Sequence, residues 1–124
     1  MPIVTNSETM KARTKGLALR VIRLCRKLPA SQEGRIISRQ LMRSATSVGA
    51  NYRAVCRARS SADFVSKLGI VLEEADETLF WLELLVEAEI ATSDTTQSLR
   101  QEADELVSIF VASLRTAKGI QSAI

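Results

Sequence analysis

The sequence contains no histidine, two prolines, five glycines and 4% aromatic residues. The absence of histidine excludes the ordinary Ser-His and Cys-His forms of nucleophile activation. It also excludes the Glu-x-x-His pairs that hold metal in di-iron helical bundles. Because proline removes a helix donor and clashes with the preceding turn, its scarcity favours long, uninterrupted helices. We therefore expect an all-α protein without a histidine-based active site.

Several other signals are missing. No stretch approaches the roughly 20 apolar residues that span a bilayer, and residues 1–8 lack the features of a signal peptide. Neither a glycine-rich phosphate loop nor a Cys-x-x-Cys pair occurs. Cys25 and Cys56 lie beside apolar faces of different predicted helices, which favours two buried thiols. We expect a cytoplasmic protein that has no metal or other cofactor and is not an enzyme.

Charge is distributed unevenly along the 124 residues, a length that suits one domain spanning residues 1–124. Residues 1–59 carry 13 Lys and Arg against 2 Asp and Glu, a net charge of +11. Residues 60–124 carry 4 Lys and Arg against 12 Asp and Glu, a net charge of −8. This division indicates either an anion-binding surface on the first half or two halves that attract each other, within one subunit or between subunits.

Apolar residues recur at three- and four-residue steps in four segments, at about residues 7–28, 32–59, 62–89 and 94–118. Pro29 ends the first segment, and Ser31 is a plausible N-cap of the second. Ser60 with Asp63, and Asp94 with Gln97, resemble capping boxes. The connections are short, which predicts an antiparallel up-down-up-down four-helix bundle. A bundle that swaps one helix between subunits is the alternative.

The inward stripes of the last three segments follow from this periodicity. The second contains Ile37, Leu41, Ala45, Val48, Tyr52 and Val55. The third contains Val65, Leu68, Leu72, Ala75, Leu79, Leu82 and Val86. The fourth contains Leu99, Ala103, Leu106, Phe110, Ser113 and Ala117. The third stripe alternates strictly by three and four residues, which is typical of a bundle or coiled-coil seam.

Five arginines of the second predicted helix fall within about 80° of one another at 100° per residue. They are Arg35, Arg39, Arg43, Arg53 and Arg57. Guanidinium groups bind phosphate through a planar fork, so such a stripe suits the backbone of RNA or DNA without reading bases. The stripe is equally compatible with a solvated face, or with a face paired to the acidic second half.

The third predicted helix has a second apolar face, opposite the inward stripe. It comprises Ile70, Phe80, Trp81 and Leu84. Because one apolar stripe per helix is enough for a monomeric bundle, a second one containing Trp and Phe favours a subunit interface. A wider core is the alternative. Glu73, Glu77 and Glu87 border this face, where they are placed to meet basic helices of a neighbouring subunit.

Three segments resemble the 23S rRNA-intervening sequence protein family. They are Ser-Arg-Gln-Leu-Met-Arg-Ser-Ala-Thr-Ser-Val-Gly-Ala-Asn-Tyr-Arg at residues 38–53, Cys-Arg-Ala-Arg-Ser-Ser-Ala-Asp-Phe at 56–64, and Leu-Glu-Glu-Ala-Asp-Glu-Thr-Leu-Phe-Trp-Leu-Glu-Leu-Leu at 72–85. The resemblance implies a four-helix bundle that assembles as a homopentamer. A related retroelement accessory protein implies nucleic-acid binding. Many members carry Asn-Ile-Ala-Glu-Gly, where this chain has Asn-Tyr-Arg-Ala-Val at residues 51–55. The resemblance implies no catalytic residues.

Two functions remain open from the sequence. The first is a homo-oligomer that binds nucleic acid through exposed arginines of the stripe. The second is a structural or protein-interaction bundle in which those arginines pair with acidic helices.

Overall fold

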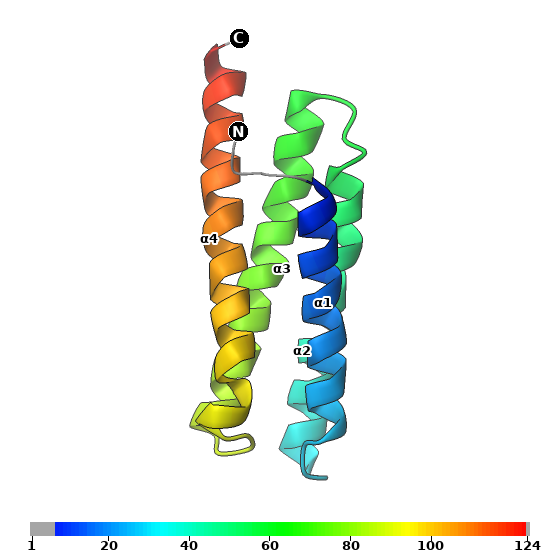
Figure 1. Ribbon diagram of the computed structural model, residues 1–124, viewed down its shortest axis with the longest axis vertical. Helices are drawn as coiled ribbons and strands as arrows, with labels where there is room; N and C mark the ends of the chain where they lie inside the picture. Colours follow the sequence, from blue (N-terminus) through cyan, green and yellow to red (C-terminus); the bar gives the residue numbers. More distant parts are fainter. Residues whose placement is uncertain (1–6, 124) are drawn as a thin grey trace.

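The computed structural model of the protein describes the backbone of residues 7–123 and the side chains of residues 7–119. Within them it contains four α-helices, which are α1 (Ser7–Arg26), α2 (Gln32–Val55), α3 (Ser61–Glu87) and α4 (Ser93–Ala123). Short turns join them, so consecutive helices run antiparallel and side by side (Figure 1). The predicted up-down-up-down bundle is confirmed. None of the described helices combines the length and the apolar character needed to cross a membrane.

Two of the predicted helix caps form as expected. The Ser31 hydroxyl accepts a hydrogen bond of 3.0 Å from the backbone N–H of Gly34, and the Ser60 hydroxyl accepts one of 3.0 Å from Asp63. Each bond satisfies a backbone donor that the first helical turn leaves unpaired. The cap predicted at Asp94 is wrong, because α4 begins one residue earlier and Thr92 accepts from the backbone N–H of Thr95 at 3.2 Å.

Three of the predicted C-terminal helix ends lie too late in the sequence, and the fourth lies too early. α1 ends at Arg26 rather than near residue 28, and α2 ends at Val55 rather than 59. α3 ends at Glu87, after which Glu89 adopts a left-handed φ of 61°. The N–H groups of Glu89 and Ile90 turn back to the carbonyls of Val86 and Leu85, a Schellman arrangement without its usual glycine. α4 continues through Gly119 to Ala123 rather than stopping near residue 118.

The core runs between the helices and is built mainly from the predicted stripes. The α2 stripe is confirmed, with Leu41, Ala45 and Val48 fully buried and Tyr52 half-buried. The α3 stripe is rotated from the prediction, because the buried positions also include Val71 and Leu85. The predicted members that are half-buried instead are Val65, Leu72, Leu79 and Val86. On α4, Ser113 and Ala117 are likewise half-buried.

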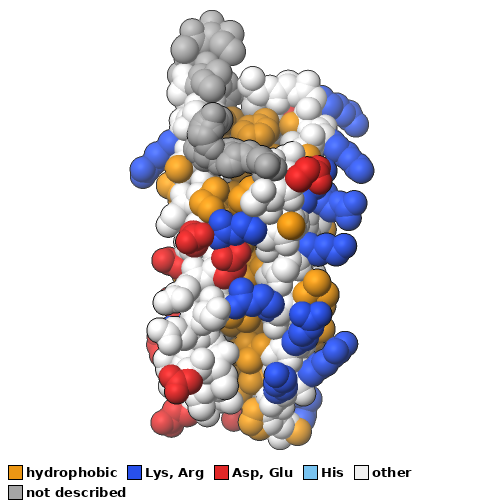
Figure 2. Space-filling model, in the orientation of Figure 1, with side chains coloured by type: hydrophobic (Ala, Val, Ile, Leu, Met, Phe, Trp, Pro, Cys, Tyr) orange, Lys and Arg blue, Asp and Glu red, His pale blue; other side chains and the backbone are white. Residues whose placement is uncertain are grey.

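The bundle is not equally closed on all sides. α2 packs along both α1 and α3, and α3 packs along α4, whereas α1 and α4 approach each other at few positions. Figure 2 shows hydrophobic side chains in the seam between α4 and α1. Arg13 crosses this seam and donates hydrogen bonds to Glu102 at 2.8 and 3.0 Å and a further one to Glu105. Arg20 donates to Ser98 at 2.7 Å.

Candidate functional site

Helix α2 carries most of the predicted arginine stripe on the outside of the bundle. Arg35, Arg39 and Arg53 are exposed on the helix. Arg57 is also exposed, but it lies in the turn after α2, because the helix ends at Val55. None of these four side chains forms an ion pair with a carboxylate among residues 7–119. They present unneutralised positive charge to solvent.

Arg43 differs from the other members of the stripe because it turns toward α3. Its guanidinium donates to the Glu74 carboxylate at 3.3 and 3.4 Å and also to Glu77. Glu77 in turn accepts a hydrogen bond of 2.9 Å from the indole N–H of Trp81. The hydrogen bonds from Arg43 and then Trp81 lower the pKa of Glu77 below the ordinary value of a glutamate. Arg43 thus links α2 to α3, and Glu77, which we predicted to meet a neighbouring subunit, pairs within its own chain.

Two hollows follow one another along the outer side of α1 and α2. The first, of about 550 Å³, lies between the first half of α1 and the second half of α2. Its lining consists of Glu8, Lys11, Ala12, Lys15, Ala18, Thr46, Gly49, Ala50 and Arg53. The second, of about 440 Å³, lies toward the other end of the same helix pair and includes Arg26, Arg35 and Arg39. We call the two hollows together the α1–α2 groove. The sequence did not predict this groove, because its shape depends on how α1 and α2 are rotated against each other.

The side with the two hollows is basic. Figure 2 shows Lys and Arg side chains along the edge formed by α1 and α2, whereas Asp and Glu gather on the side of α4. The division of charge predicted from the sequence therefore becomes a division between two sides of the molecule. Among the described residues that line the two hollows, Glu8 is the one carboxylate, and it pairs with Lys11 at 3.2 Å.

The second apolar face of α3 is exposed in part. Phe80 is 52% exposed and Ile70 is 44% exposed, whereas Trp81 and Leu84 are half-buried. The rings of Phe80 and Trp81 pack edge to face with centroids 4.9 Å apart. Ile70 lies about 15 Å from Phe80 along the helix axis at 1.5 Å per residue, so it is separate from this aromatic pair.

Ser44 of α2 has a structural role. Ser44 is fully buried, and its hydroxyl hydrogen-bonds the Thr78 hydroxyl of α3 at 3.0 Å. Both hydroxyls also reach a backbone carbonyl of their own helix, Leu41 and Glu74 respectively. Sequence analysis missed Thr78, which lies one residue before the predicted stripe position Leu79. These contacts fix the register between α2 and α3.

The two cysteines are not alike, which corrects the expectation of two buried thiols. Cys25 is half-buried, and burial raises the pKa of its thiol above the ordinary value. Cys56 is exposed, because α2 ends one residue before it. Within the described part of the chain, no group of three or more Cys, Asp and Glu residues is placed to hold a metal ion.

The fold and the surface define a class, an up-down four-helix bundle whose α1–α2 side is basic and whose α4 side is acidic. The chain belongs to the 23S rRNA-intervening sequence protein family, because residues 8–112 match that family. This confirms the resemblance found in the sequence.

Known structures and proteins add the following. The crystal structure of a protein of unknown function from the S23 ribosomal protein family of Bacteroides thetaiotaomicron is 35% identical in sequence, with a TM-score of 0.80. The match covers 88% of this chain and 97% of that one. Comparison with curated proteins gave no match. The similar structure supports the fold and carries no statement of activity.

Proposed function

We propose that this chain is a non-enzymatic, homo-oligomeric bundle that binds RNA or DNA through the exposed arginines of α2 and its following turn. The observation that carries the proposal is that Arg35, Arg39, Arg53 and Arg57 are exposed and unpaired with carboxylates of the described chain. Guanidinium groups bind phosphate through two parallel hydrogen bonds. Arg35 and Arg53 are about 27 Å apart along the helix, which matches about eight base pairs of a duplex.

Binding of this kind is sequence-independent and depends strongly on salt, because each neutralised phosphate releases counterions. We expect a fluorescently labelled duplex of about 20 base pairs to bind with a slope of log K against log salt at least as steep as about −3.6, from about 0.9 for each of the four arginine contacts. Replacing Arg39 and Arg53 by Gln reduces the steepness of this slope by about 1.8. Fluorescence anisotropy across a salt series measures both values, for RNA and DNA in parallel.

The matched control is the pair Arg115→Gln and Lys118→Gln, which removes the same charge from exposed positions on α4. This control should leave the slope unchanged. A wild-type protein that shows no salt-sensitive binding at low ionic strength contradicts the proposal. Equal effects of the two double variants also contradict it, since net charge alone would then explain binding.

Self-assembly is the second part of the proposal, and the exposure of Phe80 and Ile70 on α3 supports it. Burying these side chains against another copy removes apolar area from water, at about 25 cal/mol per Å². The family resemblance implies five subunits, which native mass spectrometry tests directly. Phe80→Ser together with Ile70→Ser should reduce the oligomer mass. Leu19→Ser is the control, because Leu19 is 42% exposed on α1, away from this face; a stable wild-type monomer at micromolar concentration refutes assembly.

The alternative function is a purely structural or protein-interaction bundle whose basic and acidic halves pair. The ion pairs of Arg13 with Glu102 and of Arg43 with Glu74 support this alternative within the chain. If pairing between subunits also uses the stripe, Arg39→Glu with Arg43→Glu should break the oligomer. An unchanged oligomer mass counts against pairing between subunits.

A further inference from the structure

We propose that the nucleic-acid backbone lies in the groove between α1 and α2, where Lys11, Lys15 and Arg26 of α1 bind phosphates opposite the arginines of α2. This inference rests on the proposed function. It extends the binding surface from one face of α2 to the facing sides of α1 and α2. It also removes Arg43 from that surface, because this side chain is held by carboxylates of α3.

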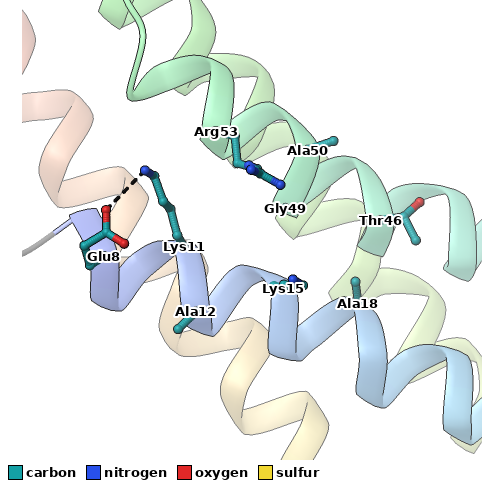
Figure 3. Close-up of a pocket in the computed structure, with 9 residues that line it drawn as sticks. All are labelled: Glu8, Lys11, Ala12, Lys15, Ala18, Thr46, Gly49, Ala50 and Arg53. Carbon is teal, nitrogen blue, oxygen red and sulfur yellow. Dashed lines mark hydrogen bonds and ion pairs between the residues drawn. The ribbon is translucent and has the colours of Figure 1, made fainter.

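The first hollow is lined by small residues and by the long basic side chains of Lys11, Lys15 and Arg53. Figure 3 shows Lys11 and Lys15 of α1 and Arg53 of α2 on opposite sides of it. The two helix backbones approach closely at Gly49, where an added Cβ would lie in ordinary van der Waals contact, 3.4 Å from the backbone oxygen of Thr14. Ala12, Ala18 and Ala50 are the other small residues of the lining. Small side chains between the cations leave room for a chain of phosphates.

The second hollow repeats the arrangement at the other end of the helix pair. Arg26 comes from the last turn of α1, and Arg35 and Arg39 come from α2. Part of the lining is apolar and is formed by Ile22, Leu28 and Met42. Lys11 and Arg26 are about 22 Å apart along α1 at 1.5 Å per residue, so the two hollows together form a path rather than a point.

The chemistry of the groove favours a phosphodiester backbone over an acidic protein helix. An amphipathic helix that docks in a groove needs large apolar side chains to receive its apolar stripe. The first hollow offers instead alanines, a glycine and Thr46 between three cations. A strand lying between two basic walls is neutralised from both sides, whereas a single stripe of arginines contacts it from one side. The charge of the groove and the small side chains of the first hollow therefore both match a nucleic-acid strand.

The sharpest test is a gain of binding. Glu8 pairs with Lys11 at 3.2 Å and is the one carboxylate in the lining of the two hollows. Glu8→Gln frees Lys11 and removes the local repulsion between a carboxylate and the phosphates, so the labelled duplex should bind more tightly. Glu33→Gln is the matched control, because Glu33 is exposed in the first turn of α2 and lines neither hollow. Equal effects of the two variants overturn the inference.

Losses of binding complete the experiment. Lys15→Gln and Arg26→Gln should each reduce the steepness of the salt slope by about 0.9, whereas Lys118→Gln and Arg43→Gln should leave it unchanged. Circular dichroism melting of every variant checks that the bundle is folded. If wild-type binding is absent, the proposed function fails with this inference. If binding depends on Arg39 but not on Lys15 or Arg26, the groove is wrong and the α2 surface stands.

A competitor identifies the class of ligand. Polyglutamate offers carboxylates, whereas an unlabelled duplex offers phosphates at the spacing of the probe. We expect the unlabelled duplex to displace the probe at a lower concentration of charge than polyglutamate, since carboxylate peptides lack the regular phosphate array. Equal displacement by polyglutamate would show that the groove is a docking site for acidic protein, and would overturn the inference.

Discussion

Arg13 is expected to hold the open seam between α1 and α4. Its guanidinium forms a two-point contact with Glu102, at 3.0 Å from Nε and 2.8 Å from Nη2, and also reaches Glu105. These charges raise the pKa of the Arg13 guanidinium above its ordinary value, with the hydrogen bond to Glu102 as the largest cause. Since α1 and α4 meet at few other positions, Arg13→Met should weaken the seam while it keeps the aliphatic stem.

The magnitude follows from the exposure of the pair. The side chains of Arg13 and Glu102 are 26% and 22% exposed, between surface and interior. Exposed pairs contribute about 0.2–1 kcal/mol, and buried hydrogen bonds to charged groups contribute about 1.5–3 kcal/mol. We therefore expect a coupling free energy of about 1–1.5 kcal/mol between Arg13 and Glu102. Arg13→Lys should recover less than half of it, because an ammonium cannot form the planar fork.

A double-mutant cycle with Arg13→Met and Glu102→Gln isolates this coupling by urea unfolding. The coupling should fall as salt rises from about 0.1 to 1 M, where the Debye length shrinks from about 10 to 3 Å. Hydrogen exchange should show faster opening of the first half of α4 in Arg13→Met. A coupling below about 0.3 kcal/mol at low salt, the usual limit of additivity, would refute this view of the seam.

Four further predictions concern a helix end, a helix interior and two titrating groups. Glu89→Gly should stabilise the protein by about 1 kcal/mol, because Glu89 has a φ of 61° and glycine adopts the left-handed conformation without strain. Gly69 lies in open space on α3, so Gly69→Ala should stabilise the protein by a similar amount through helix propensity. Urea unfolding measures both changes. Burial raises the pKa of Tyr52 to about 12. The absorbance of tyrosinate should report this value directly, because the sequence has one tyrosine. The lowered pKa of Glu77 should make stability fall as the pH drops below about 4.5, and Glu77→Gln should flatten that fall in acid unfolding.

The signs of the two titrations are opposite and make them separable. Tyr52 is neutral when folded and its folded pKa lies above the ordinary value of about 10, so its contribution is complete below pH 10 and is lost toward 12. Glu77 is charged when folded and its pKa is lowered by Arg43, so its contribution is present above the ordinary pKa and is lost at acid pH. A tyrosinate transition near 10 in the folded protein, or an acid limb unchanged in Glu77→Gln, contradicts the corresponding contact. A loss of stability in Glu89→Gly or Gly69→Ala contradicts the helix-end and propensity arguments.

The bundle was predictable from the sequence because its signals are local. The helices were predicted from apolar spacing, and their ends from Pro29, Ser31 and Ser60, and each of these signals is read from a few neighbouring positions. The short connections then predicted antiparallel packing. Helix ends were less predictable where they lack a local marker. Glu89 stands where a glycine would have marked the end of α3, and Gly119 does not end α4. The buried face of α3 was also mispredicted, because Thr78 is a polar residue and an apolar pattern does not include it. Thr78 is nevertheless buried, where its hydroxyl hydrogen-bonds Ser44.

The positions of the arginines along α2 were predictable from the sequence, but the surface that they form with other helices was not. The periodicity places the arginines on one side of α2, yet it does not say that Arg43 reaches Glu74 on the next helix. The contribution of α1 was also hidden, because Lys11, Lys15 and Arg26 become neighbours of the α2 arginines only through the packing of α1 against α2. The periodicity of one helix does not predict which side chains of a neighbouring helix will lie beside it.

The charges of the basic half fall into two groups of residues, which differ in whether they pair with carboxylates of the same chain. Arg13 and Arg43 face carboxylates of α4 and α3, so attraction between the halves already accounts for them within one chain. The cations on the α1–α2 side lie away from those carboxylates, and apart from the pair of Lys11 with Glu8, ion pairing within the described chain leaves their charge uncompensated. Holding like charges along one groove opposes folding through mutual repulsion. A bound polyanion relieves that repulsion, whereas an ordinary solvated face gains nothing from lining a groove on both walls with cations.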